Sequence, residues 1–173
     1  MTIMTRKAKH VYAALLGAAF CLPSVTGYAA GGDEQKIKAL EAQFVAAFNG
    51  KDVDAIMKVY VPGKSLLVFD VTPPRQYVGA DAYRKDWMDL FAMFKGPLKF
   101  EISDLAITAG SDVAFSHSIQ HVAGTDTKGQ PVDLTVRVTD GYRKINGRWL
   151  IAHEHVSVPV DLSTGKADLA SKP

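Results

Sequence analysis

The sequence predicts an α+β fold in which three N-terminal helices pack on a strongly curved, mainly antiparallel sheet. Hydrophobic residues recur with the 3.6-residue period of a helix between residues 33 and 96. From Leu98 to Val158 the period changes to two, which is typical of strands with one buried face. Helices followed by a run of strands indicate helices gathered on one face of a sheet, and the hollow between those layers is where ligands bind.

Length and composition fit one domain with accessory ends. The chain has 173 residues, of which 47% are hydrophobic and 22% charged, so it can build a core of ordinary size. We expect the domain to span residues 33–159 and a polar, loosely held tail to span residues 160–173.

Residues 1–29 have the layout of a secretory signal. A basic start around Arg6 precedes the apolar stretch 11–21, and the small residues Gly27 and Ala29 favour cleavage after Ala29. The apolar stretch is shorter than the roughly 20 residues that a membrane span needs, although an uncleaved anchor is the alternative. We therefore expect a periplasmic or secreted protein without stable membrane insertion.

Cleavage would change the charge and remove the only cysteine. Residues 1–29 hold three Lys or Arg and no acid, so 17 of the 20 basic residues remain beside 18 acidic ones, and the net charge becomes −1. That balance gives no indication of nucleic-acid binding. Loss of Cys21 leaves no disulfide, thiol nucleophile or thiolate metal site.

The first two helices have capping and stop signals. Asp33 is expected to cap the first helix, which ends at Asn49-Gly50. Asp52 is expected to cap a short second helix that ends before Pro62-Gly63. A hydrophobic strand over residues 65–71 follows.

The third helix is predicted to follow Gly79 and to stop at Gly96-Pro97. One apolar stripe supports it, formed by Tyr83, Trp87, Leu90, Phe91 and Phe94.

Four strands then form a predicted antiparallel meander. The alternation that begins at Leu98 slips by one residue near Ser103-Asp104, which indicates a β-bulge and a bent strand. Asn146-Gly147 is the strongest hairpin signal in the chain. The strand before this turn places Asp140 and Tyr142 on its apolar face.

Histidines share faces of two of these strands. His117 and His121 lie on one face of the second strand of the meander, together with Phe115. On the last strand, residues 148–158, the alternation places His153 and His155 on the same face as Ile151 and Ser157.

The order of these elements resembles the cone-shaped fold of nuclear transport factor 2 and ketosteroid isomerase, a superfamily that includes the polyketide-cyclase-like (SnoaL-like) proteins. The strings that carry the resemblance are Phe44-Val45-Ala46-Ala47-Phe48-Asn49-Gly50-Lys51-Asp52, Val68-Phe69-Asp70, Asp140-Gly141-Tyr142-Arg143 and the ending Gly147-Arg148-Trp149-Leu150-Ile151-Ala152-His153-Glu154-His155-Val156-Ser157. The resemblance covers residues 33–159. It implies a small-molecule pocket, a homodimer paired through the sheets, and no cofactor.

Asp70 is the first candidate catalytic residue. It ends a hydrophobic strand, and burial at the mouth of a pocket would raise its pKa toward the range that suits a general base. The alternative is a residue that only caps the turn at Thr72-Pro73. The resemblance implies that Asp70 corresponds to the proton-shuttling aspartate of the isomerases.

Asp140 and His153 complete the predicted catalytic set. A buried acid such as Asp140 can stay protonated and donate to a developing oxyanion, and the resemblance implies this role; a structural partner for Arg143 is the alternative. His153 is a candidate acid or base, with a hydrogen-bonded sheet histidine as its alternative. No histidine set has strong metal-ligand spacing, so we expect no metal.

Six residues are predicted to line the pocket: Phe44, Tyr60, Trp87, His117, Tyr142 and His155. The isomerases carry a tyrosine where this chain has Phe44, and a phenyl ring cannot donate to an oxyanion. Two functions therefore stay open. One is an isomerase or lyase that uses Asp/His acid–base chemistry on a small, apolar carbonyl or hydroxy compound, and the other is a non-catalytic ligand-binding or assembly module.

Overall fold

The structure is a computed structural model that describes residues 27–170, with side chains from residue 31 onward. The predicted signal segment lies outside the described residues, apart from its last three positions. Within the described part of the chain, no helix is long and apolar enough to cross a membrane.

Three α-helices and one short 3-10 helix precede the long strands. They are α1 (Gly27–Asn49), α2 (Val53–Met57), η1 (Gly63–Ser65) and α3 (Ala80–Ala92). The strands are β1 (Leu67–Phe69), β2 (Tyr77–Val78), β3 (Phe94–Ala109), β4 (Val113–Asp126), β5 (Pro131–Ile145), β6 (Arg148–Ser157), β7 (Val160–Asp161) and β8 (Lys166–Ala167).

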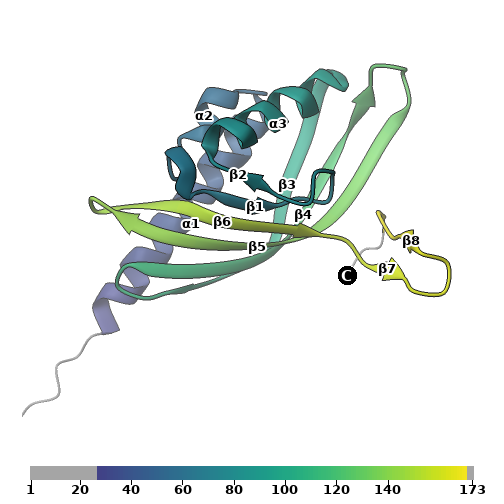
Figure 1. The fold of residues 1–173 in the computed structure, drawn as a ribbon. Coiled ribbons are helices and arrows are strands. Elements are labelled where there is room, and N and C mark those ends of the chain that lie inside the picture. The colour runs from purple at the N-terminus through teal and green to yellow at the C-terminus, as the bar shows by residue number, and fades with distance from the viewer. Residues whose placement is uncertain (1–26, 171–173) are drawn as a thin grey trace, which may run out of the picture.

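Six of these strands form one sheet in the order β2-β1-β6-β5-β4-β3. Strands β3 to β6 are the predicted antiparallel meander, and β1 adds to its edge parallel to β6. Figure 1 shows the long strands bending strongly, with the helices on the concave side. The predicted fold class is confirmed.

The first two helices differ in how they begin. The prediction for α2 is confirmed, because the Asp52 side chain accepts a hydrogen bond from the backbone N–H of Ala55 at 2.9 Å. The cap assigned to Asp33 is wrong, since α1 already begins at Gly27. Asp33 lies inside the helix, buried, and its carboxylate pairs with Lys36 and Lys144, which lowers its pKa.

Helix α3 follows Gly79 as predicted but ends earlier. Gly79 adopts a φ of 93°, a conformation that glycine reaches without strain. The helix ends at Ala92, and Phe94 is the first residue of β3, so the assignment of Phe94 to the helical stripe is wrong.

The bulge predicted near Ser103-Asp104 is confirmed. The pairing of β3 with β4 jumps from Ser103–Ile119 to Ala106–His117, and Asp104 takes a positive φ of 52°. The extra residue bends β3 and keeps hydrophobic side chains on its inner face on both sides of the slip.

The C-terminal segment is more ordered than its composition suggests. Strands β7 and β8 pair as a small hairpin, and the backbone N–H of Thr135 donates to the carbonyl of Leu169 at 2.9 Å. Leu169 is therefore linked to β5, whereas the loose attachment of residues 160–173 stays a prediction.

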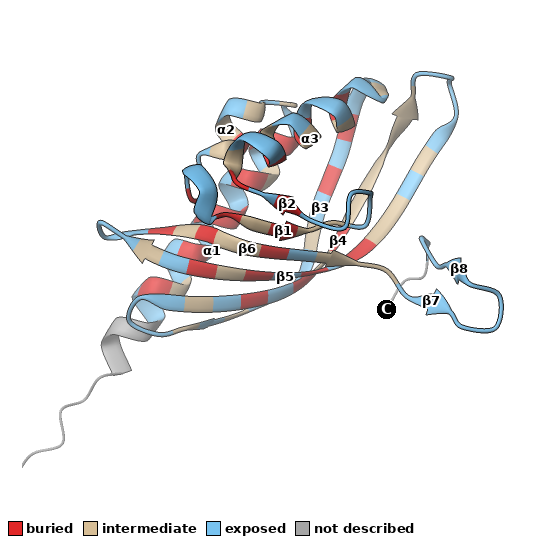
Figure 2. Cartoon of the chain, viewed as in Figure 1, coloured by how far each residue is buried: buried red, intermediate tan, exposed pale blue. Residues whose placement is uncertain are grey.

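The core lies between the helices and the concave face of the sheet. Figure 2 shows the buried positions of the strands and of α3 facing each other across this space. Its largest buried hydrophobic side chains are aromatic: Phe44, Phe48, Tyr60, Tyr83, Trp87, Phe91, Phe100, Tyr142 and Trp149. This core shapes the walls of one cavity.

Candidate functional site

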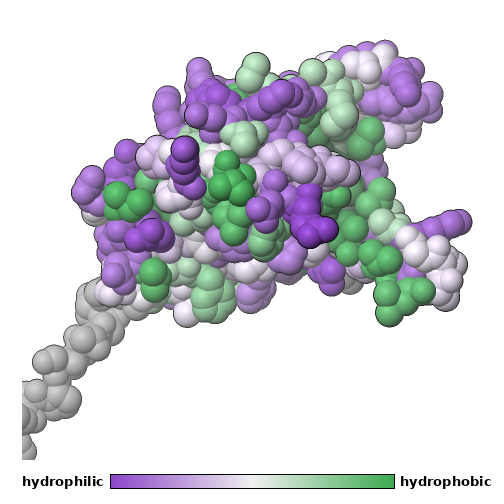
Figure 3. Space-filling view, viewed as in Figure 1, coloured by the Kyte–Doolittle hydropathy of each residue, from purple (hydrophilic) through white to green (hydrophobic). Residues whose placement is uncertain are grey.

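A cavity of about 700 Å³ opens between helices α1 and α3 and the concave face of the sheet. Its hydrophobic wall includes Phe44, Phe48, Trp87, Leu90, Phe94, Phe100, Val122, Leu134, Val136 and Val156. The space-filling view shows hydrophobic surface around the hollow between the β4–β5 arm and the C-terminal hairpin (Figure 3). A cavity of this size and lining suits a small, largely apolar molecule.

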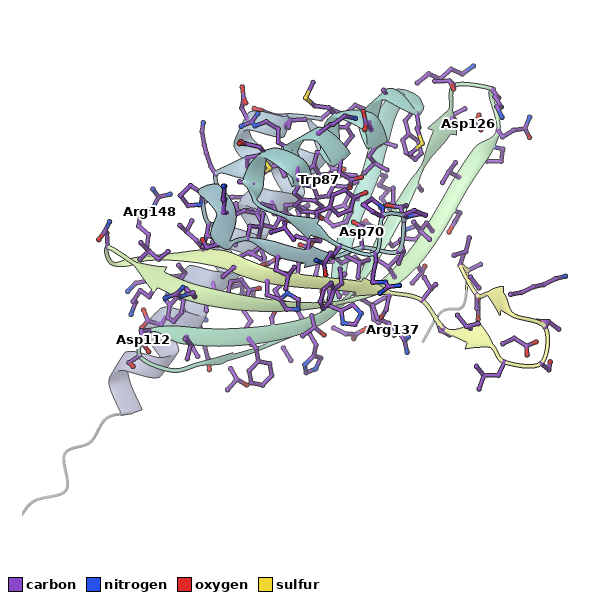
Figure 4. The ribbon with its side chains drawn as sticks, viewed as in Figure 1. Asp70, Trp87, Asp112, Asp126, Arg137 and Arg148 are labelled. Atoms are coloured by element: carbon purple, nitrogen blue, oxygen red, sulfur yellow. The ribbon has the colours of Figure 1, made fainter. Side chains whose placement is uncertain are left out.

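Polar residues also line the cavity. Glu154 of the sheet, bonded by Tyr83, Gln120 of β4, and Asp70 at the end of β1 are among them. Figure 4 shows Asp70 and Trp87 on the same side of the sheet.

Glu154 belongs to a row of polar residues that crosses three strands. Ser116 of β4 pairs with Asp140 of β5, which in turn pairs with Glu154 of β6. All three side chains point to the inner face and are buried. Residues directly opposite each other on neighbouring strands have side chains in contact range, so the two carboxyl groups interact.

Two tyrosines hold the Glu154 carboxylate. The hydroxyl of Tyr60 donates to Oε2 at 2.7 Å, and the hydroxyl of Tyr83 donates to Oε1. Only 5% of Glu154 is exposed, and burial raises its pKa from 4.5 to about 7 against the opposing effect of the two tyrosine hydrogen bonds. A carboxyl of this kind exchanges protons near neutral pH.

Asp140 lies behind Glu154 and does not reach the cavity. It is 2% exposed, and its Oδ1 has no hydrogen-bond partner among the described residues. Burial, together with the charges of Glu154 and Glu41, raises its pKa well above the usual range. The protonated form of Asp140 is therefore favoured by its surroundings.

The polar row continues away from the cavity toward α1. The hydroxyl of Tyr142 donates to Oε1 of Glu41 at 2.6 Å and lies 2.7 Å from Oγ of Ser116. Both Glu41 and Tyr142 are buried, and burial raises the pKa of each. Glu41, Asp140 and Glu154 thus form one set of interacting acids beneath the cavity floor.

Asp70 combines features of both interpretations made from the sequence. Its Oδ1 accepts from the backbone N–H of Thr72 at a long 3.3 Å, which is the turn contact. It also lines the cavity, and burial raises its pKa, with the nearby charge of Asp86 acting in the same direction. The residue lies at the cavity mouth, and its catalytic role stays a prediction.

The predicted catalytic histidine, His153, does not line the cavity. The pairing of β5 with β6 shifts between Tyr142–Ile151 and Gly141–His153, so Ala152 is an extra residue. This bulge reverses the alternation and turns Glu154 inward, which corrects the face assigned to His153 and His155. His153 Nδ1 instead lies 2.9 Å from the carbonyl oxygen of Leu67.

His117 and His155 lie on the outer face of the sheet. They border a separate shallow depression that also includes Arg137 and Thr139. Figure 4 shows Arg137 on the side of the sheet away from Trp87. On β4 the inner face carries the polar Ser116, Ser118 and Gln120 before Val122 reaches the cavity, whereas Val113 and Phe115 are exposed on the outer face.

The other predicted lining residues divide into two groups. Phe44 and Trp87 line the cavity. Tyr60 and Tyr142 lie behind its wall, where their hydroxyls bind Glu154 and Glu41. Within the described residues, no group of three or more His, Cys, Asp or Glu is placed to hold a metal ion.

Glu154 is the site residue that the sequence analysis missed. Alternation alone placed it on the outer face between two histidines. Gly141 was the available signal, because an isolated glycine inside a strand indicates a bulge. It lies at the register shift that turns Glu154 inward.

Comparisons with known proteins agree with the fold. A nuclear transport factor 2-like protein of unknown function from Pseudomonas putida is 30% identical, with a TM-score of 0.74 over 83% of this chain and 98% of that one. Two more distant structures share the fold. A nuclear transport factor 2-like superfamily protein from Salmonella enterica is 16% identical, with a TM-score of 0.70 over 79% of this chain and 97% of that one. A ketosteroid isomerase-like protein from Erwinia carotovora is 22% identical, with a TM-score of 0.61 over 71% of this chain and 93% of that one. No curated protein matches the chain.

The sequence, compared without the structure, matches a known domain family. The SnoaL-like domain matches residues 37–161, which include α1 from Ile37 onward, the whole six-stranded sheet and every residue of the cavity. The chain therefore belongs to the SnoaL-like family of the nuclear transport factor 2-like superfamily.

Proposed function

We propose that this protein catalyses proton transfer on a small, largely apolar hydroxy or carbonyl compound, as an isomerase or lyase that needs no cofactor. The observation that carries the proposal is the buried Glu154 carboxyl, oriented by two tyrosines at the surface of an apolar cavity. Burial of a carboxyl lowers the stability of the fold, and a role in a reaction explains why this one is kept at the cavity.

Glu154 is the group that moves the proton. Its raised pKa, about 7, matches the working range of a general acid or base at neutral pH. As a carboxylate it takes a proton from a carbon beside the substrate carbonyl, and the electron pair passes to the carbonyl oxygen. Return of the proton to another carbon completes an isomerisation, whereas loss of a β-hydroxyl as water completes a dehydration.

Two further cavity residues support this step. The side-chain amide of Gln120 lines the cavity and is a donor for the developing oxyanion, a role that Phe44 cannot fill. Asp70 at the mouth is a second carboxyl whose charge favours the protonated form of Glu154. The predicted Asp/His pair thus becomes an Asp/Glu pair.

Hydrogen–deuterium exchange tests the proposal without knowledge of the natural substrate. The protein is incubated in D₂O with 2-tetralone, a bicyclic ketone with acidic C–H groups, and deuterium uptake is followed by NMR. We expect exchange above the buffer rate, and a decrease of about 10²–10⁴-fold in Glu154→Gln. Glu101→Gln on the exposed side of β3 is the matched control and should retain the full rate.

Two results would contradict the proposal. One is exchange no faster than in buffer although 2-tetralone binds, which is the behaviour of a non-catalytic binding module. The other is an unchanged exchange rate in Glu154→Gln, which would remove the assigned proton carrier.

Export and pairing are separate proposals. Cleavage after Ala29 would release the domain outside the cytoplasm, and N-terminal sequencing of the protein from the culture medium or periplasm measures it. The outer face of the sheet exposes Val113 (60%) and Phe115 (50%), hydrophobic residues suited to pairing with a second copy. Sedimentation of Phe115→Glu beside the unaltered protein tests this dimer.

A further inference from the structure

Acidic residues outnumber basic residues in the lining of the cavity. Four acidic residues line it, namely Asp70, Asp86, Asp89 and Glu154. Lys85 is the single cationic side chain in its lining, and its Nζ is paired with Asp89 on the exposed surface of α3. Within the described residues, the cavity therefore offers no free cation to an anionic ligand.

Asp70 and Asp86 form the acidic part of the mouth. Each lines the cavity, and the charge of Asp86 acts on Asp70. Asp86 Oδ1 accepts a hydrogen bond from the hydroxyl of Tyr77 at 2.5 Å. In the described part of the chain neither carboxyl forms an ion pair, and the cationic charge that acts on Asp86 is that of Lys85, whose Nζ is paired with Asp89.

Aromatic residues line the cavity together with these carboxyl groups. Tyr77 and Trp87 both line the cavity, and Tyr77 contacts Asp86 directly. The face of an aromatic ring attracts a cation, most strongly for tryptophan and when the cation has lost its water. Carboxylates and ring faces together therefore favour one kind of ligand group.

We propose that the cavity binds a ligand that carries a positively charged nitrogen on an apolar body, with the ammonium group at the mouth beside Asp70 and Asp86. This proposal names the class of substrate for the proposed function. The statement that the ligand is a substrate rests on the proposed function, whereas the statement that the ligand binds does not. The apolar body fills the space between α1, α3 and the sheet, where Phe44, Phe48 and Phe100 form the wall.

The ammonium group improves the electrostatics of the mouth in two ways. It offsets the repulsion between the Asp70 and Asp86 carboxylates, and it lies close to Tyr77, whose hydroxyl bonds Asp86. A carboxylate or phosphate on the same body would add a further negative charge to a partly desolvated site. The cavity should therefore discriminate by charge among ligands of equal shape.

Three probes with one ring system test the charge preference. They are 2-naphthylmethylamine, a cation at pH 7.5, the neutral 2-naphthylmethanol, and the anion 2-naphthoate, each titrated by calorimetry into the full chain. We expect the amine to bind roughly tenfold tighter than the alcohol, and 2-naphthoate to bind most weakly.

Variants assign the preference to the mouth. Asp70→Asn should reduce amine binding to the level of the alcohol and leave alcohol binding unchanged. Asp133→Asn, on the exposed outer face of the sheet, is the matched control and should keep the preference. Equal binding of amine and alcohol, preference for 2-naphthoate, or no amine binding at about 1 mM would each overturn the inference.

The outcome is separable from that of the proposed function. Amine preference without deuterium exchange of 2-tetralone would contradict the catalytic proposal and leave the ligand class standing. Exchange that depends on Glu154, without amine preference, would contradict the ligand class alone.

Discussion

Replacement of Glu154 by glutamine should change how the stability of the protein depends on pH. The side chain keeps its shape, and the amide can still accept from one tyrosine hydroxyl and donate to the other. What the variant loses is the titratable proton of a carboxyl that is 5% exposed and has a pKa of about 7 in the folded chain.

The sign follows from the two pKa values. Below pH 4.5, the ordinary value, folded and unfolded chains both carry the proton, so the favourable contribution of the raised pKa is fully present. Between 4.5 and about 7 only the folded chain keeps it, and stability falls as pH rises. The loss is about 1.4 kcal/mol per pH unit, or about 3 kcal/mol over this window.

Chemical denaturation at pH 4.5 and pH 7.5 measures the effect. The free energy of unfolding of the unaltered protein should fall relative to Glu154→Gln by about 3 kcal/mol between the two conditions. Because the charge of Glu154 also raises the pKa of Asp140, the difference between the two proteins reports Glu154 together with its effect on Asp140. An equal difference between the two proteins at both pH values would refute the burial-based account of Glu154.

Three further predictions concern the frame that holds the site, each measured as the free energy of unfolding in denaturant. Phe100→Ala should cost about 3–5 kcal/mol, because a buried aromatic of the cavity wall leaves a void; a cost below about 1 kcal/mol would contradict its place in the core. Asp52→Ala should cost about 1 kcal/mol through loss of its bond to the N–H of Ala55, and no change would argue against the cap. Gly124→Ala should cost about 1–2 kcal/mol, since its new methyl group would lie 2.4 Å from Cδ2 of Leu98, and a neutral result would show that β3 yields easily there.

Local signals in the sequence were sufficient for most of the fold. The change of hydrophobic period near Leu98 separates the helices from the meander, and Asp52 and Gly79 begin their helices where expected. The slip at Ser103-Asp104 identifies the bend of β3 because the hydrophobic pattern itself shifts there. These features depend on residues close together in the chain.

The site was harder to predict because it depends on pairing between strands. The bulge in β6 shifts the inner hydrophobic positions from Trp149 and Ile151 to Val156, but His153, Glu154 and His155 lie between them and obscure the slip. On β4 the inner face carries the polar Ser116 and Gln120, so hydrophobicity indicated the wrong face. Only the register across the sheet aligns Asp140 with Glu154 and places one of them at the cavity.

The central claim is that a desolvated carboxyl able to carry a proton near neutral pH faces the cavity. Titration of the side-chain carboxyl carbons by ¹³C NMR, with Glu154→Gln and Asp70→Asn used to assign the signals, tests it most directly. The account predicts that Glu154 titrates near 7 and that Asp70 titrates above its ordinary 3.8. Titration of Glu154 close to 4.5 would mean a solvated carboxylate and would contradict the claim.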